Sequence, residues 1–109
     1  MALLIISTVP NEDVARNLSK ILLEKRVATC VNIISKVKSN YWWNGSIESS
    51  DEIILLIKTT EDKYSQLEDL IRKNHPYEIP EIIAFDIKRF VLVSEFYHFN
   101  LYHLILFRI

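Results

Sequence analysis

Apolar residues along the first quarter of the chain predict a strand followed by a helix. Leu3 to Val9 is an apolar run, which is typical of a strand buried on both faces. Asn11 is a good helix N-cap, and apolar residues then recur at helical spacing as far as about Lys25. These residues are Val14, Leu18, Ile21 and Leu22.

The next stretch predicts one very long β-hairpin. Apolar, β-branched and aromatic residues run from Val27 to Trp43, and the return arm ends at Thr60. Asn44-Gly45 supplies the turn, because this pair tolerates positive φ at both central positions. An arm of about 17 residues spans roughly 56 Å at ~3.3 Å per residue. A compact chain of this length has a radius of gyration of only about 13 Å. We therefore expect the tip to project and to be covered by another chain.

The second half repeats the order of the first. Thr60 is the expected N-cap of a second amphipathic helix, and Asn74 is expected to end it in a left-handed conformation. A last strand is expected from Glu81 to Ile87. One constant shift aligns Ile5-Ile6 with Ile54-Leu55 and the first helix with the second. Two strand–helix–strand units predict an α+β, ferredoxin-like βαββαβ fold.

Composition narrows the class of protein. The 109 residues form one domain, half of them are apolar, and the formal net charge of −1 gives no footprint for nucleic acid. The single cysteine, Cys30, forms no internal disulfide, so nothing implies an oxidising compartment. We expect a cytoplasmic protein without a secretory signal. Phe90 to Ile109 is apolar, but Glu95 and Asn100 within it make lipid exposure costly, so no membrane span is expected.

Four motifs resemble those of the CutA divalent-cation-tolerance family in order and spacing. The resemblance covers Leu3 to about Ile87, so residues 1–88 are expected to form a CutA-like domain and residues 89–109 a divergent tail. The motifs are Thr29-Cys30-Val31-Asn32, Tyr41-Trp42-Trp43-Asn44-Gly45, Ile57-Lys58-Thr59-Thr60 and His75-Pro76-Tyr77-Glu78-Ile79-Pro80-Glu81-Ile82-Ile83.

The resemblance implies a ferredoxin-like fold similar to that of PII signalling proteins, and a homotrimer in which the long hairpins pair with neighbouring subunits. Trp42 and Trp43 would then lie in the trimer interface, where aromatic residues are the usual anchors. Some relatives bind copper through a cysteine at the end of the first strand and a histidine pair before Pro-Tyr. Those positions here are Ser7 and Asn74-His75, so only His75 is kept.

Cys30 and His75 are the candidate metal ligands, because transition metals such as Cu²⁺ favour thiolate and imidazole. A packing role is the more common one for a cysteine within an apolar strand, and a capping role competes for a histidine at a helix end. The chain has no paired-cysteine or paired-histidine metal motif.

A second group of candidates points to a small-ligand cleft. Lys58 stands at a strand end before a helix, and Tyr41, Tyr77 and Glu78 stand in the two aromatic motifs. Gly45 is the only glycine, which excludes Gly-rich nucleotide loops of the Walker or Rossmann type. Ser7, Cys30 and the histidines form no nucleophile–base pattern, so no enzymatic activity is expected.

Three hypotheses follow. The preferred one is a non-enzymatic, homotrimeric protein that binds or responds to divalent cations, copper first among them. The second is a PII-like signalling module that binds small anions in clefts between subunits. The third is a trimeric scaffold for an unidentified partner protein.

Overall fold

The computed structural model describes residues 1–93 and 98–99 of the chain. The first four strands and the two α-helices follow the order βαββαβ, which confirms the expected ferredoxin-like fold. The elements in chain order are β1 (Ala2–Val9), α1 (Glu12–Glu24), β2 (Cys30–Trp43), β3 (Ser46–Thr60), the 3₁₀ turn η1 (Glu61–Lys63), α2 (Tyr64–Asn74), β4 (Ile82–Ile87), β5 (Leu92–Val93) and β6 (His98–Phe99).

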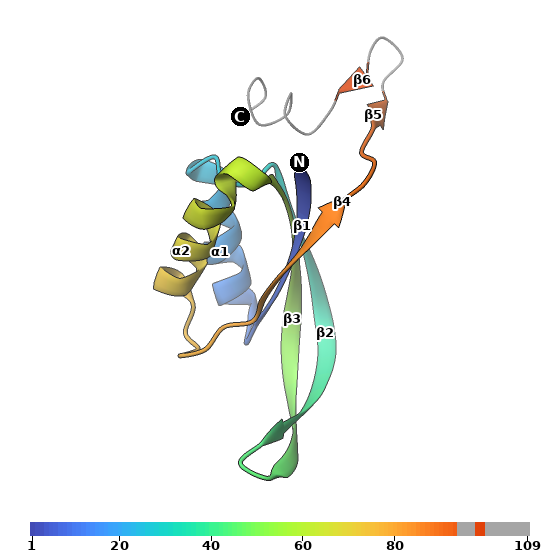
Figure 1. The fold of residues 1–109 in the computed structure, drawn as a ribbon. Helices are drawn as coiled ribbons and strands as arrows, with labels where there is room; N and C mark the ends of the chain where they lie inside the picture. The colour runs from blue at the N-terminus through green and yellow to red at the C-terminus, as the bar shows by residue number, and fades with distance from the viewer. Residues whose placement is uncertain (94–97, 100–109) are drawn as a thin grey trace.

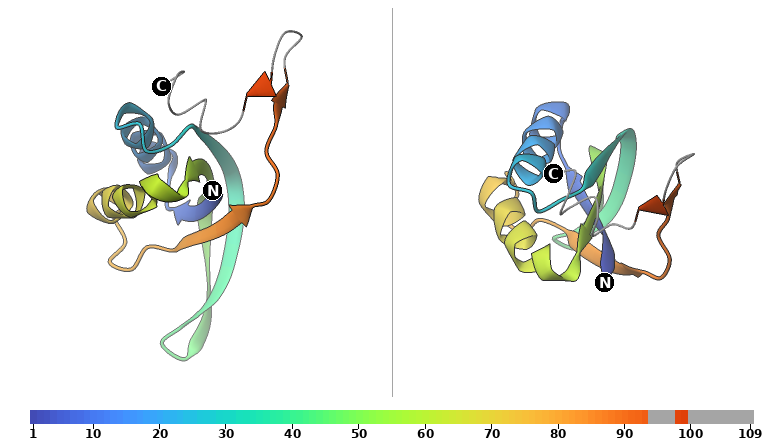
Figure 2. Two further views of the ribbon diagram at one scale, coloured as in Figure 1. Left: turned by 45° about the horizontal axis from the view of Figure 1, so that its top comes forward. Right: turned by 90° about the horizontal axis from the view of Figure 1, so that it is seen from above.

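The four long strands form one antiparallel sheet in the order β2-β3-β1-β4. Ile5 at the middle of β1 lies opposite Ile57 of β3 on one side and Ala84 of β4 on the other. Both helices cover the same face of the sheet (Figure 1 and Figure 2). The fold is therefore a two-layer sandwich of helices on a sheet.

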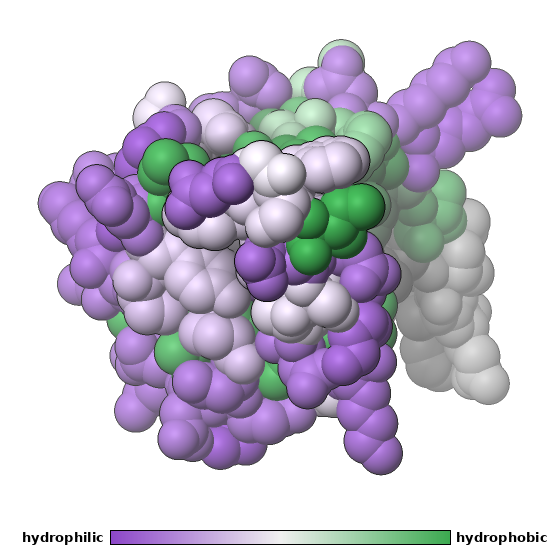
Figure 3. All heavy atoms as spheres, turned by 90° about the horizontal axis from the view of Figure 1, so that it is seen from below, coloured by the Kyte–Doolittle hydropathy of each residue, from purple (hydrophilic) through white to green (hydrophobic). Residues whose placement is uncertain are grey.

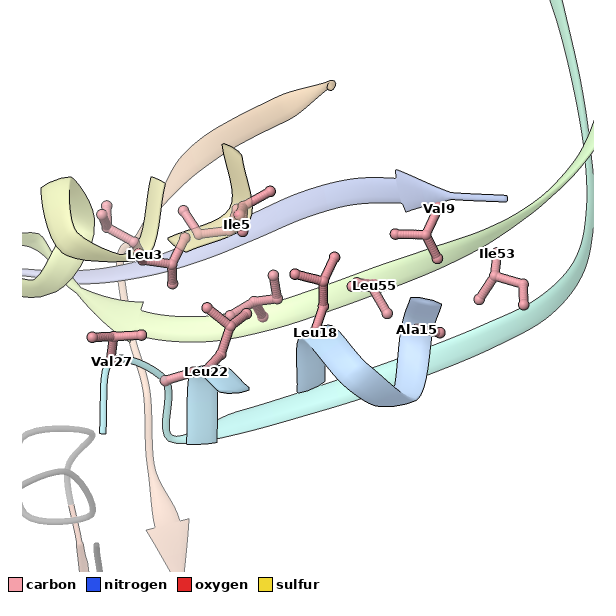
Figure 4. Close-up of a cluster of buried hydrophobic side chains, with 13 residues drawn as sticks. Leu3, Ile5, Val9, Ala15, Leu18, Leu22, Val27, Ile53 and Leu55 are labelled. Carbon is pink, nitrogen blue, oxygen red and sulfur yellow. The ribbon is translucent and has the colours of Figure 1, made fainter. Parts of the chain in front are cut away.

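The hydrophobic core lies between these two layers (Figure 4). Alternate residues of β1 are buried because successive side chains of a strand point to opposite faces. Leu18 and Leu22, one helical turn apart on α1, are fully buried against them. Leu67 and Ile71 of α2 repeat that spacing. The helical and strand periodicities of the sequence thus meet in one core.

The hairpin is nearly as long as predicted. β2 has 14 residues and β3 has 15, and the chain extends 53 Å along its longest axis. Asn44 and Gly45 have φ angles of 50° and 80°, which confirms the turn with positive φ at both positions. A β-bulge interrupts the pairing between Ile34 and Val37, and Lys36 within it has a φ of 61°. The bulge bends the hairpin where it leaves the domain.

Three local expectations were wrong. β2 begins at Cys30 and not at Val27, because Val27 is buried in the connection that follows α1. Thr60 does not cap an α-helix, since η1 precedes α2 and the Thr60 hydroxyl hydrogen-bonds the carboxylate of Asp62 at 2.5 Å. Asn74 is the last residue of α2 and has no positive φ, so the chain leaves the helix in an extended conformation at His75.

The second face of the sheet is covered by neither helix. Strand pairing places Leu4 beside Phe85 and Ile6 beside Ile83, pointing away from the core. Phe85 is 50% exposed. We call this surface the open face, and its apolar residues are Leu4, Ile6, Ile34, Ile54, Leu56, Ile83 and Phe85.

The short strands β5 and β6 pair with each other on the side of the sheet away from the helices (Figure 2). Most of the predicted tail, residues 89–109, lies outside the described residues. Among residues 1–93 and 98–99, no helix is both long and apolar enough to cross a membrane.

Candidate functional site

A cleft of about 790 Å³ lies between the hairpin and the segment that joins α2 to β4. Strands β2 and β3 form one wall, and the Pro76–Glu81 segment forms the other. The lining residues are Thr8, Ser39, Asn40, Tyr41, Trp43, Ser50, Glu52, Pro76, Tyr77, Glu78, Ile79 and Glu81.

Strand alternation decides which hairpin side chains face the cleft. Tyr41 and Trp43 are two residues apart on β2 and therefore point to the same face. Trp42 points to the opposite face, where it pairs with Ile47. Trp42 and Ile47 are 72% and 66% exposed, so the two tryptophans occupy different surroundings. Figure 3, seen from the hairpin end, shows pale and hydrophobic atoms exposed among the hydrophilic surface.

His75 fixes the other wall of the cleft. Its Nε2 lies 2.7 Å from the carbonyl oxygen of Thr8, and its Nδ1 lies 3.1 Å from the backbone N of Tyr77. Because a backbone N–H only donates, Nδ1 accepts from Tyr77, and Nε2 carries the proton donated to Thr8. The imidazole and the Tyr77 ring are also in contact, with centroids 4.8 Å apart. His75 thus ties the Tyr77 segment to the end of β1.

Tyr77 reaches across the cleft to the hairpin. Its hydroxyl donates a hydrogen bond of 2.9 Å to Oε2 of Glu52. Burial raises the pKa of Tyr77 to about 12, and the hydrogen bond and negative charge of Glu52 add to that rise. The Tyr77 hydroxyl therefore stays a proton donor throughout the physiological pH range.

The charged lining of the cleft is acidic. Glu52, Glu78 and Glu81 line it, and no lysine, arginine or histidine among the described residues does so. The hydroxyls of Tyr41 and Ser50 are 3.2 Å apart on the hairpin wall. An acidic cleft with aromatic walls attracts cations and repels anions.

The two candidate metal ligands lie apart. Cys30 is paired with Lys58 at the start of the hairpin, and Lys58 is in turn opposite Leu4 of β1. His75 contacts Thr8, which is four residues further along β1, or about 13 Å. Within residues 1–93 and 98–99, no three His, Cys, Asp or Glu side chains gather as a metal site.

Three of the four predicted cleft residues are brought together. Tyr41, Tyr77 and Glu78 line the cleft. Lys58 does not line it: strand alternation places Lys58 on the same face of β3 as Glu52, but it lies ten residues along that strand from Glu48, the partner of Tyr41. In the sequence, Glu52 is one of three carboxylates on the hairpin return, with Glu48 and Asp51, that could hold a hard cation weakly but are more typical of a solvated charge patch. The contact with Tyr77 distinguishes Glu52 from the other two.

Ser7 is fully buried, and its hydroxyl donates a hydrogen bond of 2.6 Å to the carbonyl of Glu81. The side chain of Asn74 donates to the carbonyl of Leu70 at 2.8 Å. The side chains of both Ser7 and Asn74 are therefore engaged in hydrogen bonds within the chain.

Comparison with known proteins agrees with this architecture. A model of the CutA1 divalent ion tolerance protein family matches residues 3–97. The chain belongs to this family. The family match extends ten residues beyond the Ile87 limit of the motif resemblance, as far as residue 97.

Individual CutA proteins are similar over most of the chain. The divalent-cation tolerance protein CutA of Thermus thermophilus is 42% identical over 83 residues, which cover 76% of this chain and 81% of that protein. Human protein CutA is 42% identical over 82 residues, 75% of this chain, but the match spans only 46% of the human protein. The solved structure of the Thermus thermophilus divalent cation tolerance protein superposes with a TM-score of 0.80 at 40% identity, covering 82% of this chain and 86% of that one.

Proposed function

We propose that this CutA-family protein works as a non-enzymatic homotrimer in divalent-cation tolerance, with its open faces packed against one another. The open face carries the proposal. It presents Ile34, Ile83 and Phe85 to solvent in a single chain, although each is large and apolar. If the open faces of identical subunits pack against one another, this apolar area is removed from water and no other protein is needed to cover it.

The hairpin adds a second apolar surface. Trp42 and Ile47 stand side by side on the face of the hairpin opposite the cleft, and both are largely exposed. A neighbouring subunit that packs on the hairpin would bury both, and exposed tryptophans are frequent anchors of interfaces. Trp43 faces the cleft and would be buried only where the neighbour reaches that side.

Metal binding is proposed to depend on the assembly. Cys30 lies on the open-face side of β2, in register with Asn32 and Ile34. Packing of open faces would therefore bring copies of this thiol toward a shared interface, and thiolate favours copper among the divalent and monovalent first-row ions. His75 is the weaker ligand, because a metal ion would have to displace its bond to Tyr77 or to Thr8.

The absence of enzymatic activity is part of the proposal. The two candidate nucleophiles have partners other than a histidine: the Ser7 hydroxyl donates to the carbonyl of Glu81, and the Cys30 thiol lies 3.6 Å from Oδ1 of Asn32. Neither contact activates a nucleophile as an adjacent base would. The proposed compartment is the cytoplasm, where a lone thiol stays reduced.

An anaerobic copper titration by calorimetry, in both oxidation states, tests the metal role. Competition with a chelator of known affinity removes adventitious surface binding. We expect saturation at a simple ratio per subunit or per trimer, lost in Cys30→Ser and weakened in His75→Ala. Asn74→Ala is the matched control at the same helix end and should bind as the wild type does. Non-stoichiometric heat with the wild-type protein would refute the metal role.

A PII-like ligand site is the second candidate, because Tyr41, Tyr77 and Glu78 line one cleft. Lys58 would then have to come from a neighbouring subunit. Binding of a small anion that is lost in Lys58→Ala would favour this function. The acidic lining of the cleft argues against it.

A further inference from the structure

Glu52 is a nearly buried carboxylate, and only one of its two oxygens accepts a hydrogen bond from the described residues. It is 9% exposed. Oε2 accepts from the Tyr77 hydroxyl at 2.9 Å, whereas Oε1 has no hydrogen bond to any of the described residues. Oε1 is not among the fully inaccessible side-chain atoms of the described chain, and Glu52 lines the cleft. Oε1 therefore keeps some access to solvent, and it belongs to a side chain that lines the cleft.

Glu52 also lacks a counter-charge. Among residues 1–93 and 98–99, no lysine, arginine or histidine forms an ion pair with it. Buried carboxylates are usually paired, because removing a charge from water without a partner is costly. The neighbouring Asp51 of β3, by contrast, is exposed and paired with Lys38. A cation bound in the cleft could therefore pair with Glu52, which has no basic side chain among the described residues as its partner.

The shape of the cleft favours an organic cation over a metal ion. Its three glutamates do not gather into a metal-binding group, so they cannot surround one small ion. A volume of about 790 Å³ is within the range of small-molecule sites. The rings of Tyr41, Trp43 and Tyr77 lie along the same walls. Aromatic faces attract ammonium and guanidinium groups and also cover the aliphatic part of such a ligand.

We propose that this cleft binds a small organic cation whose ammonium or guanidinium group pairs with Oε1 of Glu52 and whose body lies against Tyr41, Trp43 and Tyr77. Glu78 and Glu81 also line the cleft and are exposed, so they attract the ligand and hold a second positive group where it has one. The proposal goes beyond cation tolerance and does not depend on Cys30.

Calorimetric titration of the full-length protein with agmatine, a guanidinium–ammonium ligand, tests this inference. Pentylurea is the uncharged probe of similar length. We expect saturable binding of agmatine at one site per subunit and none of pentylurea. Equal binding of the two probes, or no binding of agmatine, would overturn the proposal.

Glu52→Gln is the decisive variant, because the amide keeps the size of the side chain and an acceptor for Tyr77 while it removes the charge. We expect at least a tenfold loss of agmatine affinity. Asp51→Asn removes the same charge from an exposed position of β3 that points to the opposite face from Glu52 and does not line the cleft, so it should change the affinity less than twofold. Equal losses in the two variants would mean that the net charge of the hairpin, and not the site, attracts the ligand.

Two further measurements keep the inference testable. Tyr41→Leu leaves Glu52 in place and alters a side chain that is 42% exposed, so it should fold and should lose about fivefold in affinity from the missing cation–π contact. Unchanged binding in Tyr41→Leu would overturn the proposed pose. Cys30→Ser should bind agmatine as the wild type does, which separates this site from the proposed metal site.

A capped serine peptide with a single arginine distinguishes the source of the cation. Binding of agmatine in preference to the peptide assigns the site to a free small molecule, as proposed. Binding of the peptide alone would overturn the small-molecule assignment and would point to an arginine side chain of a partner protein.

Discussion

Phe85 offers the sharpest test of the proposed trimer, because it is the aromatic residue of the open face as defined above and is half exposed. It stands on β4 opposite Leu4, so its side chain points away from the core between sheet and helices. Truncation to alanine should therefore leave the folded subunit nearly unchanged. It should weaken the association of subunits, since the apolar area that the interface covers becomes smaller.

The magnitude follows from the exposed area. A phenylalanine side chain buries roughly 200 Å², and half of Phe85 is exposed in the single chain. At about 25 cal/mol per Å², covering the remaining ~100 Å² contributes about 2.5 kcal/mol per subunit. Three subunits then lose roughly 7.5 kcal/mol, or about five and a half decades in the equilibrium constant. Because trimer dissociation depends on the square of the concentration, the midpoint should rise by roughly 500-fold.

Sedimentation velocity across several decades of protein concentration measures this shift. Leu23→Ala is the matched control, because Leu23 is a partly exposed apolar residue on α1, away from the open face. The control should dissociate at the wild-type concentration. If Phe85→Ala also dissociated there, or if Leu23→Ala were equally weakened, the open face would not be the subunit interface.

Three predictions concern the fold and the cleft. Thr59→Val should destabilise the protein to urea by about 1–3 kcal/mol, because the buried Thr59 hydroxyl donates to the carbonyl of Val27 at 2.6 Å. Gly45→Ala should cost about 1 kcal/mol in thermal unfolding, since Gly45 has a φ of +80° although the space around it is open. In an ultraviolet titration one tyrosine, Tyr77, should ionise near pH 12, and Glu52→Gln should lower that pKa. An unfolded tyrosine ionises near pH 10, so the folded state binds more protons between about pH 10 and 12 and its stability should fall as the pH rises through that window.

Local sequence patterns were sufficient to predict the order of strands and helices in the fold. The helical spacing in α1 and α2, the Asn44-Gly45 turn and the repeated strand–helix–strand order each depend on residues close together in the chain. Period and turn chemistry therefore predicted the ferredoxin-like order and the long hairpin correctly. They failed at element ends such as Thr60, where a hydroxyl–carboxylate contact and a 3₁₀ turn replaced the expected cap.

The candidate site depended on contacts that no local pattern contains. Glu52 and Tyr77 meet because the segment after α2 crosses the base of the hairpin, which brings together residues 25 positions apart. The same crossing engages both ring nitrogens of His75 and makes a metal-binding role less favourable than its sequence position indicated. Sequence alone determined the strands and helices, through the spacing of their apolar residues, and the position of the hairpin turn, because these properties depend on residues close together in the chain. Tertiary structure decided which side chains share a cleft and which charge lacks a partner, because packing and burial arise only when distant segments come together.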